Sequence, residues 1–184
     1  MAGRNKLLKK RLKELIWTFV VMLLIAGVVM LVFLMTGAPT LKLAIKKYYD
    51  AVGKMDTGMY ISACYPVKWQ KNYKPEQMEV SLDEVVENAL SFQSGATFSD
   101  LKIIKKEKVD DELLQEFNDS INRIYGFEMG ASKMYKVTFS MTMHLEDVET
   151  KNQNTGFITR YVYKCGGRWF FFADTLVQVD IGLD

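Results

Sequence analysis

The residues able to carry chemistry are few, and they lie far apart along the chain. His144 is the only histidine, and it lies on the polar side of an alternating stretch. As a general base it would need an orienting carboxylate, which Asp174 or Asp180 could supply across a sheet. A solitary histidine on a strand surface explains the pattern equally well, because catalysis needs several convergent partners. We therefore predict no catalytic residue and no enzymatic activity.

Other reactive residue types also lack a chemical context. Ser94 and Ser99 lie outside any nucleophile-elbow motif, and no glycine-rich phosphate loop is present. Cys64 and Cys165 are too far apart in sequence for a short metal-binding or redox motif. Whether a disulfide joins the two cysteines is an open alternative, although their aromatic neighbours favour two free, buried thiols. We predict no cofactor and no metal site.

An uncharged apolar run occupies residues 15–35. As a helix it would be about 31 Å long, close to the thickness of a bilayer's hydrocarbon core. The run exceeds the apolar core of a cleaved signal peptide, which is the alternative reading, with Thr36-Gly37-Ala38 as a cleavage site. Basic residues concentrate before the run, which predicts a cytoplasmic amino terminus. We thus predict a cytoplasmic tail at 1–14, a transmembrane helix and signal anchor contacting the lipid bilayer at 15–35, and an extracytoplasmic domain at 36–184 of a single-pass cell-membrane protein.

The charge balance argues against nucleic-acid binding. The chain has 24 basic and 22 acidic residues, and six of the basic ones precede the apolar run. The remainder is slightly acidic, whereas a nucleic-acid-binding domain needs a basic patch. We therefore expect no nucleic-acid partner.

Periodicity predicts helices followed by a sheet. Helical patterns cover 39–54, 57–64, 81–95 and 111–125, with Asp56 or Thr57 and Asp110 or Asp111 as N-caps. Residues 67–75 look irregular, whereas 101–109, 133–146, 157–165 and 168–179 look like strands, and Gly166-Gly167 predicts a tight hairpin. The predicted fold class is α+β, a cone-shaped domain of helices packed on a curved antiparallel sheet.

Aromatic residues are densest at Trp169–Phe172. Alternation sends Phe170 and Phe172 to one face and their neighbours to the other, so this strand is apolar on both sides. One side must be covered by other parts of the chain or by a partner, or else form an exposed binding surface. The predicted interaction or pocket surface comprises Trp69, Tyr73, His144, Phe170 and Phe172.

The sequence resembles the nuclear-transport-factor-like superfamily, also described as cystatin-like, in its membrane-anchored bacterial form. The resemblance covers most of residues 40–176 and rests on packing and turn residues, namely Ile45, Tyr48, Tyr49, Met55-Asp56, Tyr60, Tyr65-Pro66 and the closing Lys164-Cys165-Gly166-Gly167-Arg168-Trp169-Phe170. Enzymes of this superfamily place carboxylates and a tyrosine in the open mouth of the cone, and Asp56 resembles one such acid position. Many anchored members are non-catalytic binding or assembly modules.

Two functions follow from the resemblance. The first is a non-catalytic, membrane-tethered extracytoplasmic interaction or scaffold module, similar to the inner-membrane assembly-factor family of type IV secretion systems, with a protein partner or a second copy of the chain. The alternative is a small-ligand or cell-envelope binding domain that uses the cone pocket. A lyase or isomerase that uses the same cone pocket is less favoured than either of these two functions.

Overall fold

The computed structural model describes residues 2–35, 37–72, 96–145, 153–154 and 156–183. The chain divides into two compact units, Met1–Met35 and Thr36–Asp184. The predicted helix at 81–95 and Tyr73 lie outside the described residues.

The first unit is a single helix, α1 (Ala2–Met35). Nevertheless, no helix in the described part of the chain is long and apolar enough to cross a membrane. The predictions of a transmembrane helix at 15–35, of a signal anchor and of a single-pass cell-membrane location are therefore wrong on this finding.

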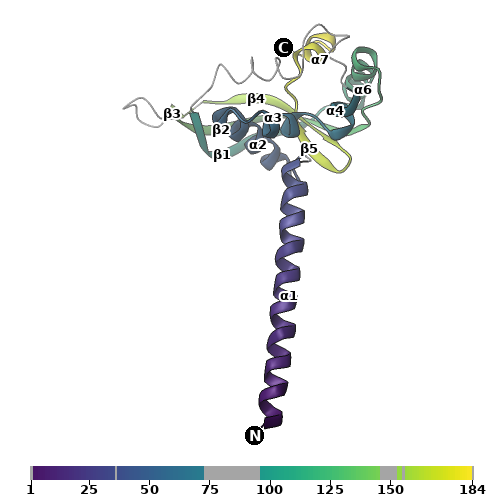
Figure 1. The fold of residues 1–184 in the computed structure, drawn as a ribbon. Helices are drawn as coiled ribbons and strands as arrows, with labels where there is room; N and C mark the ends of the chain where they lie inside the picture. Colours follow the sequence, from purple (N-terminus) through teal and green to yellow (C-terminus); the bar gives the residue numbers. More distant parts are fainter. Residues whose placement is uncertain (1, 36, 73–95, 146–152, 155, 184) are drawn as a thin grey trace. The chain divides into compact units, whose positions relative to one another are not determined.

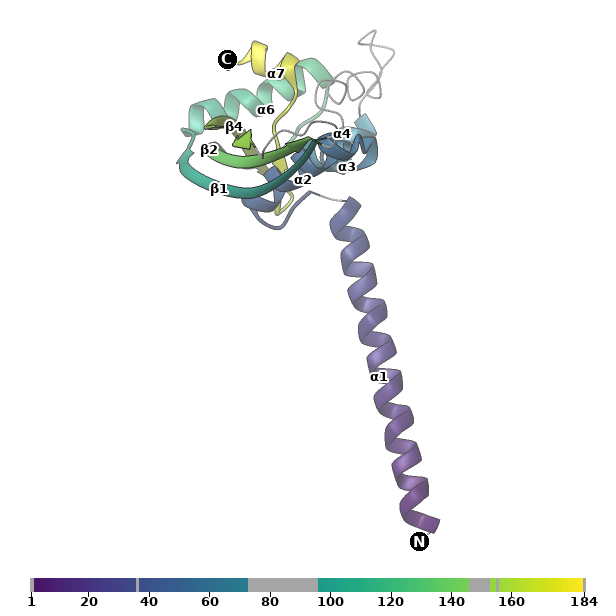
Figure 2. The same cartoon turned by 90° about the vertical axis from the view of Figure 1, so that its left-hand side faces the viewer.

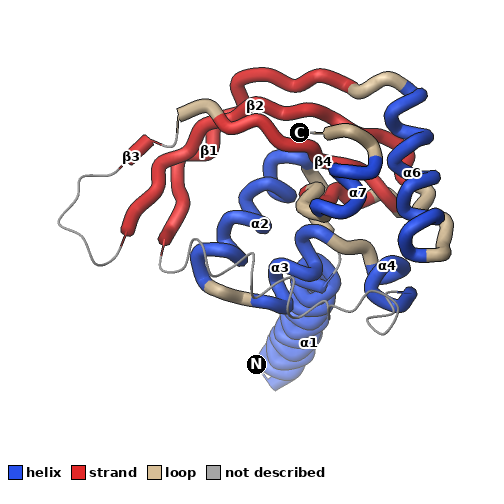
Figure 3. The backbone as a smooth tube through the Cα atoms, turned by 90° about the horizontal axis from the view of Figure 1, so that it is seen from above, coloured by secondary structure: helices blue, strands red, loops and turns tan. Residues whose placement is uncertain are grey.

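The second unit is α+β, with a curled antiparallel sheet (Figures 1 and 3). The strand order is β1-β2-β4-β5, and the short β3 pairs with β2. The strands are β1 (Ala96–Lys108), β2 (Ala131–Leu145), β3 (Gln153–Asn154), β4 (Ile158–Cys165) and β5 (Arg168–Phe171). The described helices are α2 (Leu41–Lys54), α3 (Thr57–Cys64), α4 (Val67–Asn72), α6 (Asp111–Tyr125) and α7 (Thr175–Asp180).

Helices cover both faces of the sheet. On one face, Tyr49 of α2 contacts Phe139 of β2 and Phe171 of β5. On the other face, Phe117 of α6 packs against Tyr163 of β4. Figure 2 shows the curved strands β1 and β2 beside α2, and α6 next to α7. Tyr163 also donates its hydroxyl to the carbonyl of Cys64 in α3 at 2.6 Å, so α3 and α6 both pack against β4.

Several helices and turns form where local sequence signals predict them. Asp56 caps α3, with its side chain accepting a hydrogen bond from the Met59 amide at 2.8 Å. Asp110 caps α6 in the same way, and Gly126 ends that helix with φ +72°. The hairpin glycines Gly166 and Gly167 have φ +55° and +79°, which confirms the predicted tight turn.

Two segments differ from the prediction. Residues 67–72 form α4 instead of an irregular stretch, because Trp69 is buried against Tyr65 and Tyr125 and holds this turn in place. The last strand ends at Phe171 instead of reaching position 179. Asp174 stops it, because its side chain accepts the Val177 amide at 2.9 Å and begins α7.

Candidate ligand-binding cavity beside helix α2

Most of the predicted interaction surface lies in the core. The exposed fractions are 1% for Trp69, 3% for Phe170 and 1% for Phe172. Phe170 stacks on Tyr163, and Phe172 packs edge-on against Phe117. The apolar face of β5 whose cover the sequence left open is thus covered by the chain itself.

His144 lies apart from that aromatic core. It pairs across the sheet with Thr97, and its Nε2 lies 2.9 Å from the Oγ of Ser99. The carboxylates considered as its partners are engaged elsewhere, since Asp174 accepts from the Tyr125 hydroxyl at 2.5 Å and Asp180 pairs with Arg123. The histidine therefore belongs to a local group on β1 and β2.

That local group contains a distorted strand. The register of β1 against β2 shifts between Ser99 and Lys102, and Asp100 has φ +53°. This is a β-bulge, in which an extra residue in one strand bends it locally. Aspartate tolerates this left-handed conformation better than most residues. The Ser99 hydroxyl donates to Asp100 Oδ2 at 3.0 Å, so serine, aspartate and histidine form one chain of hydrogen bonds.

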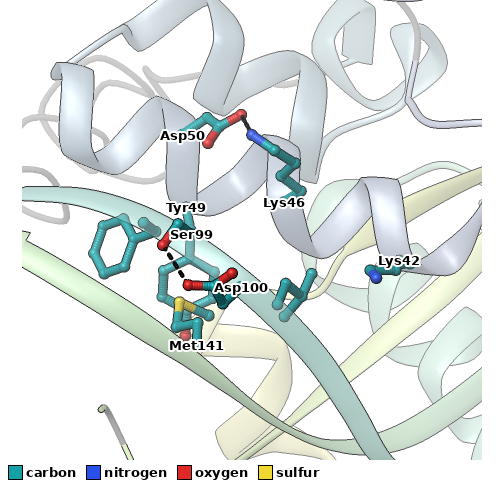
Figure 4. Close-up of a pocket in the computed structure, with 9 residues that line it drawn as sticks. Lys42, Lys46, Tyr49, Asp50, Ser99, Asp100 and Met141 are labelled. Atoms are coloured by element: carbon teal, nitrogen blue, oxygen red, sulfur yellow. Dashed lines mark hydrogen bonds and ion pairs between the residues drawn. The ribbon is translucent and has the colours of Figure 1, made fainter. Parts of the chain in front are cut away.

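A cavity of about 330 Å³ opens between α2 and the bulge (Figure 4). We call it the α2–β1 cavity, and it is lined by Lys42, Lys46, Tyr49, Asp50, Phe98, Ser99, Asp100, Leu101 and Met141. The apolar members come mainly from the sheet, whereas the lysines come from one side of α2. The cavity thus has an apolar floor and a charged rim.

The helix presents its rim residues at regular intervals. Lys42, Lys46 and Asp50 are spaced four residues apart, which places them on one face of α2. Lys46 and Asp50 form an ion pair, as Figure 4 shows. Among the described residues Lys42 has no ion pair. The rim therefore offers a cation, Lys42, that no described residue neutralises by direct contact.

Tyr49 separates the cavity from the core. Its side chain is 6% exposed and contacts Phe98 edge-on, with ring centroids 5.1 Å apart. Burial raises the pKa of the Tyr49 phenol, and the positive charge of Arg160 partly opposes this. The phenol is therefore neutral at physiological pH.

A glycine lets α2 approach β1 closely. A Cβ atom at Gly53 would lie 1.9 Å from the carbonyl oxygen of Ala96 and 3.5 Å from the Phe98 ring. Only a residue without a side chain fits at this contact. Gly53 therefore sets the distance between the two walls of the cavity.

The geometry favours binding over catalysis. In the familiar hydrolase arrangement a carboxylate orients the histidine, which in turn activates the serine. Here Asp100 contacts Ser99 instead, so the carboxylate competes with His144 for the single serine proton. Among the described residues no group of histidine, cysteine, aspartate and glutamate side chains is placed to hold a metal ion. The two cysteines are free thiols, and Cys64 is fully buried.

Sequence reasoning missed the main residues of this cavity. The four-residue spacing of Lys42, Lys46 and Asp50 is visible in the sequence as the polar face of an amphipathic helix. The bulge at Asp100 has no comparable sequence signal, because a glycine would be the usual marker. The pairing of α2 with β1 had to come from the tertiary structure.

No protein-family model, curated protein or solved structure matches this chain. The resemblance to the nuclear-transport-factor-like superfamily therefore stays a prediction, and the geometry must carry the functional argument.

Proposed function

We propose that residues 36–184 form a non-catalytic binding module that takes a small amphipathic molecule into the α2–β1 cavity. The observation that carries this proposal is the composition of the cavity wall: apolar side chains at the floor and Lys42 at the rim. Ligand sites in proteins are typically concave, mostly apolar and equipped with a few polar groups that orient the ligand. The predicted superfamily, whose members hold ligands in a cone, agrees with this proposal.

The size of the cavity limits the ligand. Its volume of about 330 Å³ lies at the lower end of the range for small-molecule sites. At about 30 Å³ for each water-sized group, it holds on the order of ten non-hydrogen atoms. A short aliphatic chain with a single anionic group fits both this volume and the lysine at the rim.

Partner binding through the aromatic cluster has less support. That hypothesis needed the aromatic residues at 169–172 to lie at the surface, whereas Phe170, Phe171 and Phe172 are at most 3% exposed. Within the described part of β5, Trp169 is the one partly exposed aromatic ring, and it lies over Lys164 and beside Tyr135. We therefore favour a small ligand over a protein partner at this part of the chain.

Methyl NMR of the full chain tests the proposal. Methionine methyl groups are labelled with carbon-13, because Met141 lines the cavity and Met134 is buried elsewhere in the core. On titration with hexanoate we expect the Met141 signal to shift and saturate while the Met134 signal stays in place. Hexylamine, which has a similar chain with the opposite charge, is expected to bind more weakly.

Matched variants make the test specific. Leu101→Trp fills the cavity and should weaken hexanoate binding roughly tenfold or more, which is about 1.4 kcal/mol. Ile104→Trp on the same strand is the control, because Ile104 is 53% exposed and lies outside the cavity lining. The proposal is overturned if hexanoate leaves Met141 unchanged, or if the two tryptophan variants bind it equally well.

A further inference from the structure

A second cavity, of about 340 Å³, shares no lining residue with the α2–β1 cavity. We call it the Arg160 cavity. Its walls come from Tyr48 of α2, from Thr159 and Arg160 of β4, from Phe171 at the end of β5, and from Thr175 and Gln178 of α7. This cavity plays no part in the function proposed above.

The cavity exists because β5 is shorter than β4. The last paired residues of these strands are Val162 and Phe171, and beyond them the chain leaves the sheet toward α7. Residues 158–160 of β4 continue and pair with β2 on their other side. The space between this end of β4 and α7 is the Arg160 cavity.

Arg160 is the one charged side chain among the residues that line this cavity. Arg160 lies two residues before Val162, which pairs with Phe171, and Phe171 stacks on Tyr48 of α2. Arg160 therefore lies on the face of the sheet that packs on α2. Burial raises the pKa values of Tyr48 and Tyr49, and the positive charge of Arg160 partly opposes this rise. No carboxylate pairs with Arg160 within the described ranges.

The guanidinium keeps most of its hydrogen-bonding capacity. Its Nη1 donates to the carbonyl of Thr159 at 2.8 Å, and a guanidinium has five N–H donors in total. Neighbouring polar groups are already engaged, since the Thr159 hydroxyl pairs with that of Thr138 at 2.9 Å and Gln178 Nε2 donates to the carbonyl of Phe172 at 3.3 Å. Within the described residues, Arg160 therefore keeps most of its five N–H donors for a ligand.

The Tyr48 ring supplies a flat aromatic wall, because Phe171, on which it stacks, is only 2% exposed. The rings of Tyr48 and Phe171 are stacked, with centroids 3.8 Å apart and planes 12° apart. A planar group can lie against such a wall while its charged end reaches the guanidinium. The planar fork of arginine matches the two oxygens of a carboxylate, and its single charge balances one negative charge.

We propose that the Arg160 cavity is a second binding site, specific for a small aromatic monocarboxylate. The carboxylate binds the Arg160 guanidinium, and the ring of the ligand lies against Tyr48. The site is independent of the α2–β1 cavity, so each of the two proposals can fail without the other.

Isothermal titration of the full chain with benzoate tests this proposal. We expect saturable binding that weakens as salt is added, because an ion pair at a partly exposed site is screened. Benzamide, a neutral molecule of the same shape, should bind at least roughly tenfold more weakly. Phenyl phosphate should bind no better than benzoate, because one guanidinium balances one negative charge.

Variants assign the binding to Arg160. Arg160→Gln removes the charge and should weaken benzoate binding roughly tenfold, whereas Arg160→Lys keeps the charge and should weaken it less. Lys164→Gln on the same strand is the matched control and should leave the affinity within about twofold. Leu101→Trp, which blocks the other cavity, should leave it unchanged.

Three results would overturn the proposal. They are the absence of benzoate binding, an Arg160→Gln variant that binds benzoate as the wild type does, and a clear preference for phenyl phosphate or benzamide. Urea unfolding of each variant shows whether the fold is kept, and the exposed position of Arg160 predicts that it is.

Discussion

Replacing Gly53 by alanine adds a methyl group where α2 touches β1. The new Cβ would lie 1.9 Å from the carbonyl oxygen of Ala96, whereas real Cβ contacts essentially never fall below 3.0 Å. The atom that it meets belongs to the backbone of β1, so rotation of a side chain cannot relieve the overlap. Helix and strand must therefore separate by about 1 Å, which disturbs close packing.

Two opposing effects set the magnitude. Overpacking of a well-packed contact costs about 1–3 kcal/mol, and more where the backbone has to move. Alanine favours a helix over glycine by about 1 kcal/mol, which offsets part of that cost. We expect Gly53→Ala to lower the free energy of unfolding by about 2 kcal/mol, because the clash with a backbone atom outweighs the gain in helix propensity.

Gly58→Ala in α3 is the matched control. A Cβ at Gly58 would meet only Asp56 Oδ1, at an ordinary distance of 3.6 Å, so the helix-propensity gain is not opposed. We expect this variant to be unchanged or up to about 1 kcal/mol more stable. Urea unfolding at constant pH measures both variants, and the shift of the Met141 methyl signal reports whether the cavity wall has moved in Gly53→Ala.

The outcome can refute the reasoning directly. If the Gly53 and Gly58 variants have equal stability, α2 does not approach β1 as closely as the structure has it. The width of the α2–β1 cavity, and with it the size of ligand that we propose, would then be wrong.

Three further predictions concern polar groups in the core. Burial lowers the Lys47 pKa to about 8 from 10.5, so the charged side chain opposes folding below pH 8. Lys47→Met should therefore raise the free energy of unfolding at pH 7 by up to about 3 kcal/mol. Unfolding measured at a series of pH values should show this gain fading between pH 8 and 10.5. Tyr125→Phe removes a donor from the buried Asp174 carboxylate and should cost about 1–3 kcal/mol in urea unfolding at neutral pH, with less cost in acid as that carboxylate gains a proton. Asn118→Ala breaks both side-chain hydrogen bonds to the Ala131 backbone and should lower the urea midpoint by a similar free energy.

Each of these predictions has a contradicting result. A constant difference between Lys47→Met and the wild type from pH 7 to 11 would show that the Lys47 pKa is not lowered. An acid-independent loss in Tyr125→Phe would mean that the hydroxyl contributes by packing and not by holding the Asp174 carboxylate. An unchanged midpoint in Asn118→Ala would place Asn118 in solvent, away from the start of β2.

Local signals in the sequence account for the boundaries of many elements. The caps of α3 and α6, at Asp56 and Asp110, depend on a side chain bonding an amide three residues ahead, which sequence spacing alone reveals. Likewise, the turn at Gly166-Gly167 follows from the positive φ angles that glycine adopts without strain. Such features could be predicted because cause and effect lie within a few residues.

Runs of apolar residues predicted the surroundings of a segment less well than residue spacing predicted helix caps and turns. Residues 15–35 predicted a transmembrane helix, but no described helix meets the length and apolarity needed to cross a membrane. The aromatic run at 169–172 suggested a partner surface, yet Phe170, Phe171 and Phe172 are at most 3% exposed. An apolar run shows that a segment avoids water, and it leaves open what covers that segment.

The α+β character of this chain, its helix caps and its hairpin were determined by the sequence itself, through short-range hydrogen bonding and side-chain periodicity. Only the tertiary structure decided where β5 gives way to α7, how Asp100 bends β1, and how Lys42 and Arg160 each reach a separate cavity. These outcomes depend on contacts between residues tens of positions apart, such as Gly53 with Ala96 and Tyr125 with Asp174. Packing of that kind leaves no periodic trace along the chain, because it is set by the shapes of two surfaces that meet only after folding.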